Sequence, residues 1–126
     1  MQRIEQAYGV SSPELYAVLD RSARLARREG RLDEAEGHWQ RALHLNVEAR
    51  GPSHPYVAAI LLELGRLRDG QGRCTEAEMD FGRALEITEA CDPPDAREVA
   101  RAVRCLVTHY QQRGEPERAD AVRKRG

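Results

Sequence analysis

The sequence predicts an all-α fold, a solenoid of antiparallel helix pairs, from three observations. The chain of 126 residues repeats itself at a spacing of 42 residues, which is typical of stacked helical hairpins. Within each copy, apolar residues follow the i, i+3, i+4 spacing of an amphipathic helix. Ala, Leu, Glu and Arg outnumber Val, Ile and Thr, and this composition favours helices over strands.

The repeat is clearest between residues 11–43 and 53–85, where 14 of 33 positions carry the same residue type. Trp39 meets Phe81, so a large aromatic position also corresponds. A weaker third copy follows, which gives about two and a half to three repeats. We therefore expect a single domain with the following parts: the tail of a preceding repeat's helix at 1–10, repeats at 11–52 and 53–94, and a partial repeat at 95–126.

The first helix of each pair is predicted at about 13–29, 55–70 and 95–113. In the middle copy, five residues form its apolar stripe: Val57, Ile60, Leu61, Leu64 and Leu67. A capping residue before a first-turn proline marks two of the starts, Ser12-Pro13 and Ser53-His54-Pro55. Asp95, followed by Glu98, has the spacing of a capping box and marks the third start.

The second helix of each pair is predicted at about 33–49, 75–90 and 116–124. Asp33 with Glu36, and Thr75 with Glu78, have the capping-box spacing, so Asp33 and Thr75 are predicted to cap two of these helices.

The core is predicted from residue size. Small residues are expected where the helices cross closely: Ala23 and Gly65 on the first helices, Ala35 and Ala77 on the second. Trp39 and Phe81 are expected to fill the space between one helix pair and the next.

These features resemble the tetratricopeptide repeat. Leu61, Leu64 and Gly65, together with Ala77 and Phe81, follow that family's signature. The spacing of 42 residues exceeds the usual repeat of about 34, and the link Gly-Pro-Ser-His-Pro at 51–55 resembles that of the kinesin-light-chain-like subtype. The resemblance implies a right-handed α-solenoid whose first helices line a concave, partner-binding groove.

The chain departs from this subtype at positions where paired asparagines often contact the backbone of a bound peptide. The residues found there are Asp20, Arg21, Leu62, Glu63, Arg104 and Cys105. Arginine at such positions suits recognition of a carboxylate, because the guanidinium group presents two parallel donors.

No pattern indicates catalysis, a metal site or a cofactor, so we expect a protein that is not an enzyme. His38 and His44 are six residues apart, and zinc ligands on a helix need a spacing of three or four. His54 is expected to cap or pack the link between repeats. His109 has no ligand-type residue three or four positions ahead, and Cys105 has no predicted base beside it.

Charge points to a binding surface instead. The chain has a net charge of −1, but the outer stripes of the first helices carry formal charges of +3, −1 and +2. We predict that this surface binds a partner, and its candidate residues are Arg24, Arg27, Arg28, Arg66, Arg101, Arg104 and Thr108. The alternative is that these arginines only solvate an exposed face.

Three functions follow in order of preference. The first is a protein-interaction scaffold that holds a protein or peptide segment, acidic in character, on the concave face. The second is an oligomerisation or regulatory segment of a larger repeat protein, which associates through open solenoid ends. RNA binding is less favoured, because the net charge is −1 and aromatic residues make up 5%. Three cysteines without paired spacing favour a cytoplasmic setting without a membrane segment.

Overall fold

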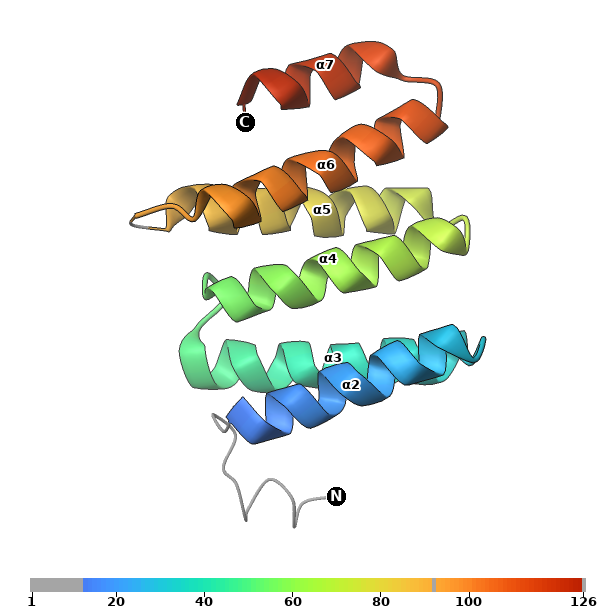
Figure 1. Cartoon of the computed structure of the whole chain (residues 1–126), viewed down its shortest axis with the longest axis vertical. Helices are drawn as coiled ribbons and strands as arrows, with labels where there is room; N and C mark the ends of the chain where they lie inside the picture. The colour runs from blue at the N-terminus through green and yellow to red at the C-terminus, as the bar shows by residue number, and fades with distance from the viewer. Residues whose placement is uncertain (1–12, 92, 126) are drawn as a thin grey trace. The chain divides into compact units, whose positions relative to one another are not determined.

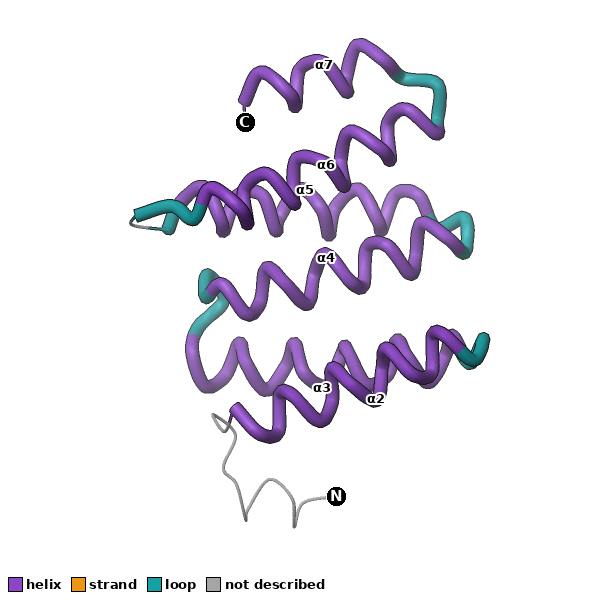
Figure 2. Tube along the Cα trace, in the orientation of Figure 1, coloured by secondary structure: helices purple, strands orange, loops and turns teal. Residues whose placement is uncertain are grey.

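The computed structural model describes residues 13–91 and 93–125, which form helices joined by short loops (Figures 1 and 2). Six helices are described, with the bounds α2 (Pro13–Arg28), α3 (Leu32–Arg50), α4 (Pro55–Gly70), α5 (Cys74–Ala90), α6 (Ala96–Gln112) and α7 (Pro116–Arg125). Each end lies within one residue of its predicted position, so the helices predicted from the sequence are confirmed. The predicted helix tail at 1–10 lies outside the described residues.

The chain forms two compact units, Met1–Ile60 and Leu61–Gly126, and their boundary falls within α4. In the first unit α2 packs against α3, and in the second unit α6 packs against both α5 and α7. The fold is thus all-helical, with helices that pack in sequential pairs. None of the described helices combines the length and apolar character that a membrane crossing requires.

A shared turn joins the first helix of each pair to the second. Gly30, Gly72 and Gly114 adopt φ values of 82°, 80° and 73°, in the left-handed region that favours glycine. After α2, the backbone N–H of Arg31 donates to the carbonyl of Ala26 at 2.8 Å, which is the six-to-one bond of a Schellman motif. The same bond recurs after α4 and α6. The glycine therefore sets the sharp reversal between the paired helices.

This tight turn overturns two predicted caps. The helices α3 and α5 begin two residues earlier than caps at Asp33 and Thr75 require, and the N-cap positions belong to Arg31 and Arg73, without a side-chain capping bond. The reason is that the residue after each glycine both closes the previous helix and opens the next. Asp95 does cap α6 as predicted, because its carboxylate accepts from the N–H of Arg97 at 2.9 Å.

His54 caps α4. Its Nδ1 accepts from the backbone N–H of Tyr56 at 3.1 Å, and its carbonyl accepts from the N–H of Val57 at 2.9 Å. Burial, and to a lesser degree the nearby Arg50 charge, lower the pKa of His54 from its ordinary value of 6.5. The predicted capping role of His54 is therefore confirmed.

Trp39 is a core residue of the first unit, and the contacts described for it are with α2 of its own helix pair. Its predicted position between one helix pair and the next stays a prediction. Its side chain is completely buried, together with Ala23 on α2 and Ala35 on α3. The indole Nε1 donates to Asp20 Oδ1 at 3.2 Å, so the one polar atom of the ring has a partner. The guanidinium of Arg27 lies 5.0 Å from the ring centroid.

Phe81 has the corresponding place in the second unit, where it packs directly on the backbone of α4. A Cβ atom built on Gly65 would lie 2.5 Å from Phe81 Cε1, closer than side-chain atoms approach. Gly65 is therefore required by the packing of α5 on α4. This close approach also brings the Phe81 ring to the floor of a groove that residues of α4 and α6 line.

Candidate functional site

An open groove of about 550 Å³ lies in the second unit, bounded by α4 and α6 with Phe81 of α5 at its floor. We call it the arginine groove, and its lining residues are Arg66, Asp69, Gly70, Phe81, Arg101, Arg104, Cys105, Thr108 and Gln112. Four of the seven predicted binding residues meet here, namely Arg66, Arg101, Arg104 and Thr108. They come together because they lie on corresponding stripes of two first helices of the repeat.

A buried carboxylate organises two of these arginines. Glu63 is 2% exposed, and its Oε2 accepts from Arg101 Nη2 at 2.9 Å. Arg66 Nη1 lies 3.7 Å from the other carboxylate oxygen, Oε1. An ionised carboxylate is costly to bury unless charged donors surround it, so Glu63 and the two arginines form one unit. Glu63 therefore holds Arg101 and Arg66 at the wall of the groove.

This burial corrects the predicted outer stripe of α4. The repeat pattern places Leu62 and Glu63 on a stripe opposite the core, but both side chains are buried. The helix is enclosed on more sides than its apolar spacing indicates, because Arg101 of α6 reaches over Glu63. An acidic residue predicted to lie on the binding surface is instead the counter-ion beneath it.

Arg104 differs from its neighbours. The side chain is exposed, and among the described residues it has no hydrogen-bond or ion-pair partner. Thr108 and Gln112 follow Arg104 at intervals of four residues, so all three lie along one face of α6 and line the groove. This face thus offers a cation, a hydroxyl and an amide in a row. Counting Glu63, the formal charge of the groove is +1.

Cys105 lies beside these groups but is not activated. Burial raises the pKa of its thiol, although the charges of Arg66 and Arg101 act in the opposite direction. A raised pKa keeps the thiol protonated, and a protonated thiol is a poor nucleophile. Its contribution to the groove is that of a small apolar wall.

The other three predicted residues lie in the first unit. Arg24 Nε donates to Asp20 Oδ2 at 2.8 Å, and Arg27 stacks on Trp39. Arg28 is exposed in the last turn of α2. None of them lines the arginine groove in the described part of the chain, so that site consists of residues from the second unit alone.

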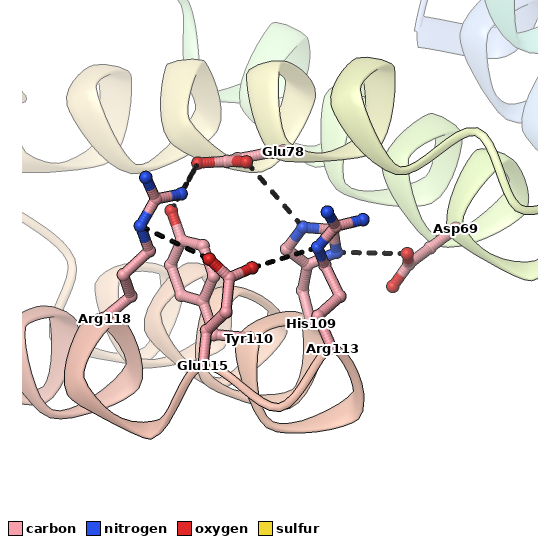
Figure 3. Close-up of polar contacts among 7 residues, drawn as sticks. All are labelled: Asp69, Glu78, His109, Tyr110, Arg113, Glu115 and Arg118. Carbon is pink, nitrogen blue, oxygen red and sulfur yellow. Dashed lines mark hydrogen bonds and ion pairs between the residues drawn. The ribbon is translucent and has the colours of Figure 1, made fainter.

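A polar cluster around His109 was missed by the sequence reasoning (Figure 3). The His109 ring is completely buried, its Nδ1 lies 3.0 Å from Asp69 Oδ1, and its Nε2 lies 4.0 Å from Glu78 Oε1. Because a carboxylate only accepts, Nδ1 carries the shared hydrogen. Nε2 has no hydrogen-bond partner among residues 13–91 and 93–125. Since Asp69 also lines the arginine groove, His109 fixes one acidic residue of that groove.

Tyr110 extends the cluster toward α7. Its hydroxyl donates to Glu78 Oε2 at 2.7 Å, and Arg118 Nη1 lies 3.4 Å from the same oxygen (Figure 3). Burial, with the Glu78 hydrogen bond as the next cause, raises the pKa of Tyr110 to about 12. These contacts join α5, α6 and α7 into one polar network.

The sequence did contain a signal for His109. It lies three residues after Leu106 on the apolar stripe of its helix, which predicts a buried position. Its partners could not be found by looking three or four residues away, because Asp69 and Glu78 belong to other helices. In the described part of the chain, no group of three or more histidine, cysteine or acidic side chains is arranged to hold a metal ion.

Comparison with known proteins gives three results. The Tetratricopeptide repeat family model matches residues 14–90. The structure of BtubC (BKLC) from P. vanneervenii is similar with a TM-score of 0.84 at 20% identity, over 98% of this chain and 50% of that chain. At this identity the likeness is one of fold, and this chain spans about half the length of BtubC. None of the curated proteins matches this sequence.

Proposed function

This chain belongs to the tetratricopeptide repeat family, and from that premise we propose that it is a scaffold whose arginine groove binds a carboxylate-bearing segment of a partner protein. Modules of this family generally mediate protein–protein interactions and are typically non-catalytic. The observation that carries the proposal is Arg104, which stands in the groove beside Thr108 and Gln112 and pairs with none of the described residues.

The groove's charge supports an acidic segment. Arg104 can offer its donors to a ligand carboxylate, and a guanidinium can engage both carboxylate oxygens at once. Arg66 and Arg101 already share Glu63, so they add positive potential without needing to rearrange. With a formal charge of +1, the groove favours one carboxylate over a dense cluster of acids.

The face of α6 supports an extended chain. Thr108 both donates and accepts, and the Gln112 amide does the same, so each can pair with a peptide N–H or C=O group. Phe81, which also lines the groove, can give an apolar contact beside these polar groups. The proposed ligand is therefore an extended segment with a carboxylate near Arg104 and a small apolar side chain beside it.

Affinity capture from a native lysate tests this proposal. The wild-type chain is compared with the double variant Arg66→Glu/Arg104→Glu and with the charge-matched control Arg83→Glu/Arg97→Glu, which alters two exposed arginines outside the groove. We expect at least one protein that the wild type and the control retain and the groove variant loses. If the groove variant retains the same proteins as the wild type, the arginine groove is not the binding site.

Peptides from a captured protein then test the chemistry. Each acidic residue of the bound segment is replaced by its amide, and affinity is measured by calorimetry. One replacement should weaken binding by about tenfold or more, because it removes a charge-assisted hydrogen bond. If all the amide peptides bind as tightly as the unmodified peptide, the groove does not recognise a carboxylate.

A further inference from the structure

Asp69 brings a negative charge to a groove whose other charged lining residues, among those the structure describes, are arginines. Its side chain is 17% exposed, so the carboxylate is largely shielded from water but can be reached from the groove. The carboxylate-binding function proposed above makes no use of this group. Because an ionised group in such a place is stable only with suitable partners, the contacts of Asp69 decide what it can bind.

One oxygen of Asp69 is held by the chain and the other is not. Oδ1 lies 3.0 Å from Nδ1 of the completely buried His109 ring, which fixes the direction of the carboxylate (Figure 3). Arg66, one turn earlier on α4, faces Glu63 instead, 3.7 Å from its Oε1. Of the residues that the structure describes, none bonds to Oδ2 of Asp69, and no arginine or lysine pairs with it. Oδ2 is therefore available to a ligand.

The two ends of the groove differ in charge. Arg101 pairs with Glu63, and eight residues later on α6 His109 meets Asp69, which follows Glu63 by six residues on α4. The helices thus run in the same direction along the groove, with the arginines at the earlier turns and Asp69 at the later ones. Arg104 precedes His109 by five residues, which is roughly 7–8 Å along the helix axis. A cation at one end therefore faces a ligand together with a carboxylate at the other.

The surroundings of Asp69 suit a single cationic side chain. In the part of the chain that the structure describes, no group of side chains is arranged to hold a metal ion, so a metal is not the expected partner of this oxygen. Gly70 comes next in the chain and also lines the groove, and nothing lies within 4 Å of the position that its Cβ would take. This leaves room beside Asp69 for the end of a lysine or arginine.

We propose that Asp69 binds a lysine or arginine side chain of the same partner segment whose carboxylate binds Arg104. This inference rests on the function proposed for the arginine groove and adds a second charge to its ligand. An extended chain advances about 3.3 Å per residue, so the acid and the base of the ligand lie about two or three residues apart. The groove then disfavours segments that carry acids alone, because a second carboxylate would meet Asp69.

Synthetic octapeptides of alanine, serine and glycine provide the probe. Each has blocked ends and carries one glutamate and one lysine, in either order and at spacings from adjacent positions to five residues apart. Matched peptides carry the glutamate or the lysine alone. Binding to the 126-residue chain is followed by NMR, in which the side-chain amide of Gln112 reports on the groove. We expect the tightest binding at a spacing of about two or three residues, about fivefold tighter than with glutamate alone.

Two variants of the chain separate the two charges. Asp69→Asn keeps an oxygen that accepts from His109 but removes the charge, so it should abolish the advantage that lysine gives and preserve that of glutamate. Arg104→Gln should do the reverse. Glu86→Gln, at an exposed position of α5 outside the groove, changes the net charge by the same amount as Asp69→Asn and should bind every peptide as the wild type does. Circular dichroism confirms that each variant is folded.

The results distinguish this inference from the function on which it rests. If peptides with glutamate alone bind as tightly as the best glutamate–lysine peptide, Asp69 does not bind a cation, and the carboxylate function stands without it. The same conclusion follows if the advantage of lysine survives in Asp69→Asn. If lysine acts through Asp69 but glutamate has no effect, the cation site stands and the carboxylate function fails. Binding by none of the peptides at millimolar concentration would overturn both.

Discussion

Glu63 shows how a single buried side chain can organise a candidate binding surface. Its carboxylate is enclosed beneath Arg101 and Arg66, and both arginines depend on it for a counter-charge. Without this anion, three cations would line the groove and repel one another. With it, two of them are held in position and Arg104 remains available for a ligand. The proposed preference of the groove for one carboxylate rests on this arrangement.

Replacing Glu63 by glutamine tests that role. The amide keeps the shape of the side chain but leaves Arg101 and Arg66 without their counter-ion, so we expect a loss of about 1–3 kcal/mol in the free energy of unfolding. Urea denaturation measures it. Glu34→Gln is the matched control, because Glu34 pairs with Arg31 at 2.9 Å but is exposed, and should cost less than about 1 kcal/mol. Equal effects in the two variants would contradict a special role for Glu63.

His109 marks a limit of what a sequence can reveal about single residues. Its place on the apolar stripe predicts burial, and the structure agrees. Its contact with Asp69 depends on how α4 and α6 pack, which helical spacing does not specify. The same holds for Glu63, whose acidic side chain predicts exposure until a partner on another helix is known. Buried polar contacts between helices were therefore the part of the site that could not be predicted.

The packing of α5 on α4 depends on Gly65. Gly65→Ala would place a methyl group against the Phe81 ring, and we expect the free energy of unfolding to fall by about 1–3 kcal/mol as the ring shifts. Gly82→Ala on α5 is the control, because nothing lies within 4 Å of its Cβ position. Alanine should stabilise that helix by up to about 1 kcal/mol. Thermal or urea unfolding of both variants measures the difference, and a neutral Gly65→Ala would show that the contact is not tight.

The start of α4 should be sensitive to pH through His54. Because the fold lowers the pKa of His54 below 6.5, the unfolded chain binds more protons at this residue than the folded chain. Its contribution to stability is therefore complete above pH 6.5 and declines as the pH falls below that value. Protonation also removes the Nδ1 acceptor that caps Tyr56 N–H.

The variant His54→Asn isolates this effect, since asparagine caps helices well and does not titrate. Urea denaturation from pH 7.5 to pH 5 should show a shallower loss of stability in the variant than in the wild type. The other histidines are common to both proteins and cancel in the comparison. Identical pH profiles would show that His54 does not sense pH.

The helices themselves were predictable because the repeat supplies the same information twice. Residues 11–43 and 53–85 share their apolar spacing and their glycines, so each copy supports the bounds of the other. The caps were less predictable. Asp33 and Thr75 have the right spacing for capping boxes, but the residue that closes the Schellman turn, two positions earlier, takes the N-cap position. Local sequence thus identified the elements, and the geometry of the turn decided their first residues.

For the chain as a whole, charge is distributed by helix type. The formal charges of residues 75–90, in the second helix of the middle repeat, sum to −4. The outer stripe of the first helix in the third repeat carries +2, although the net charge of the chain is −1. The repeat predicted that Arg66, Arg101, Arg104 and Thr108 share one surface, because they lie on the outer stripes of the first helices in neighbouring repeats. Asp69 was part of that stripe, but Phe81 was predicted only as core. That Phe81 also lines the groove could be seen only in the structure.

The central claim is that Arg104 binds a carboxylate of the partner segment. A double-mutant cycle tests it most directly: calorimetry measures the affinity of the wild-type chain and of Arg104→Gln for the captured peptide and for the same peptide with its essential acid changed to the amide. We predict a coupling energy of about 1–3 kcal/mol between the two groups. Additive effects, with a coupling near zero, would contradict the claim.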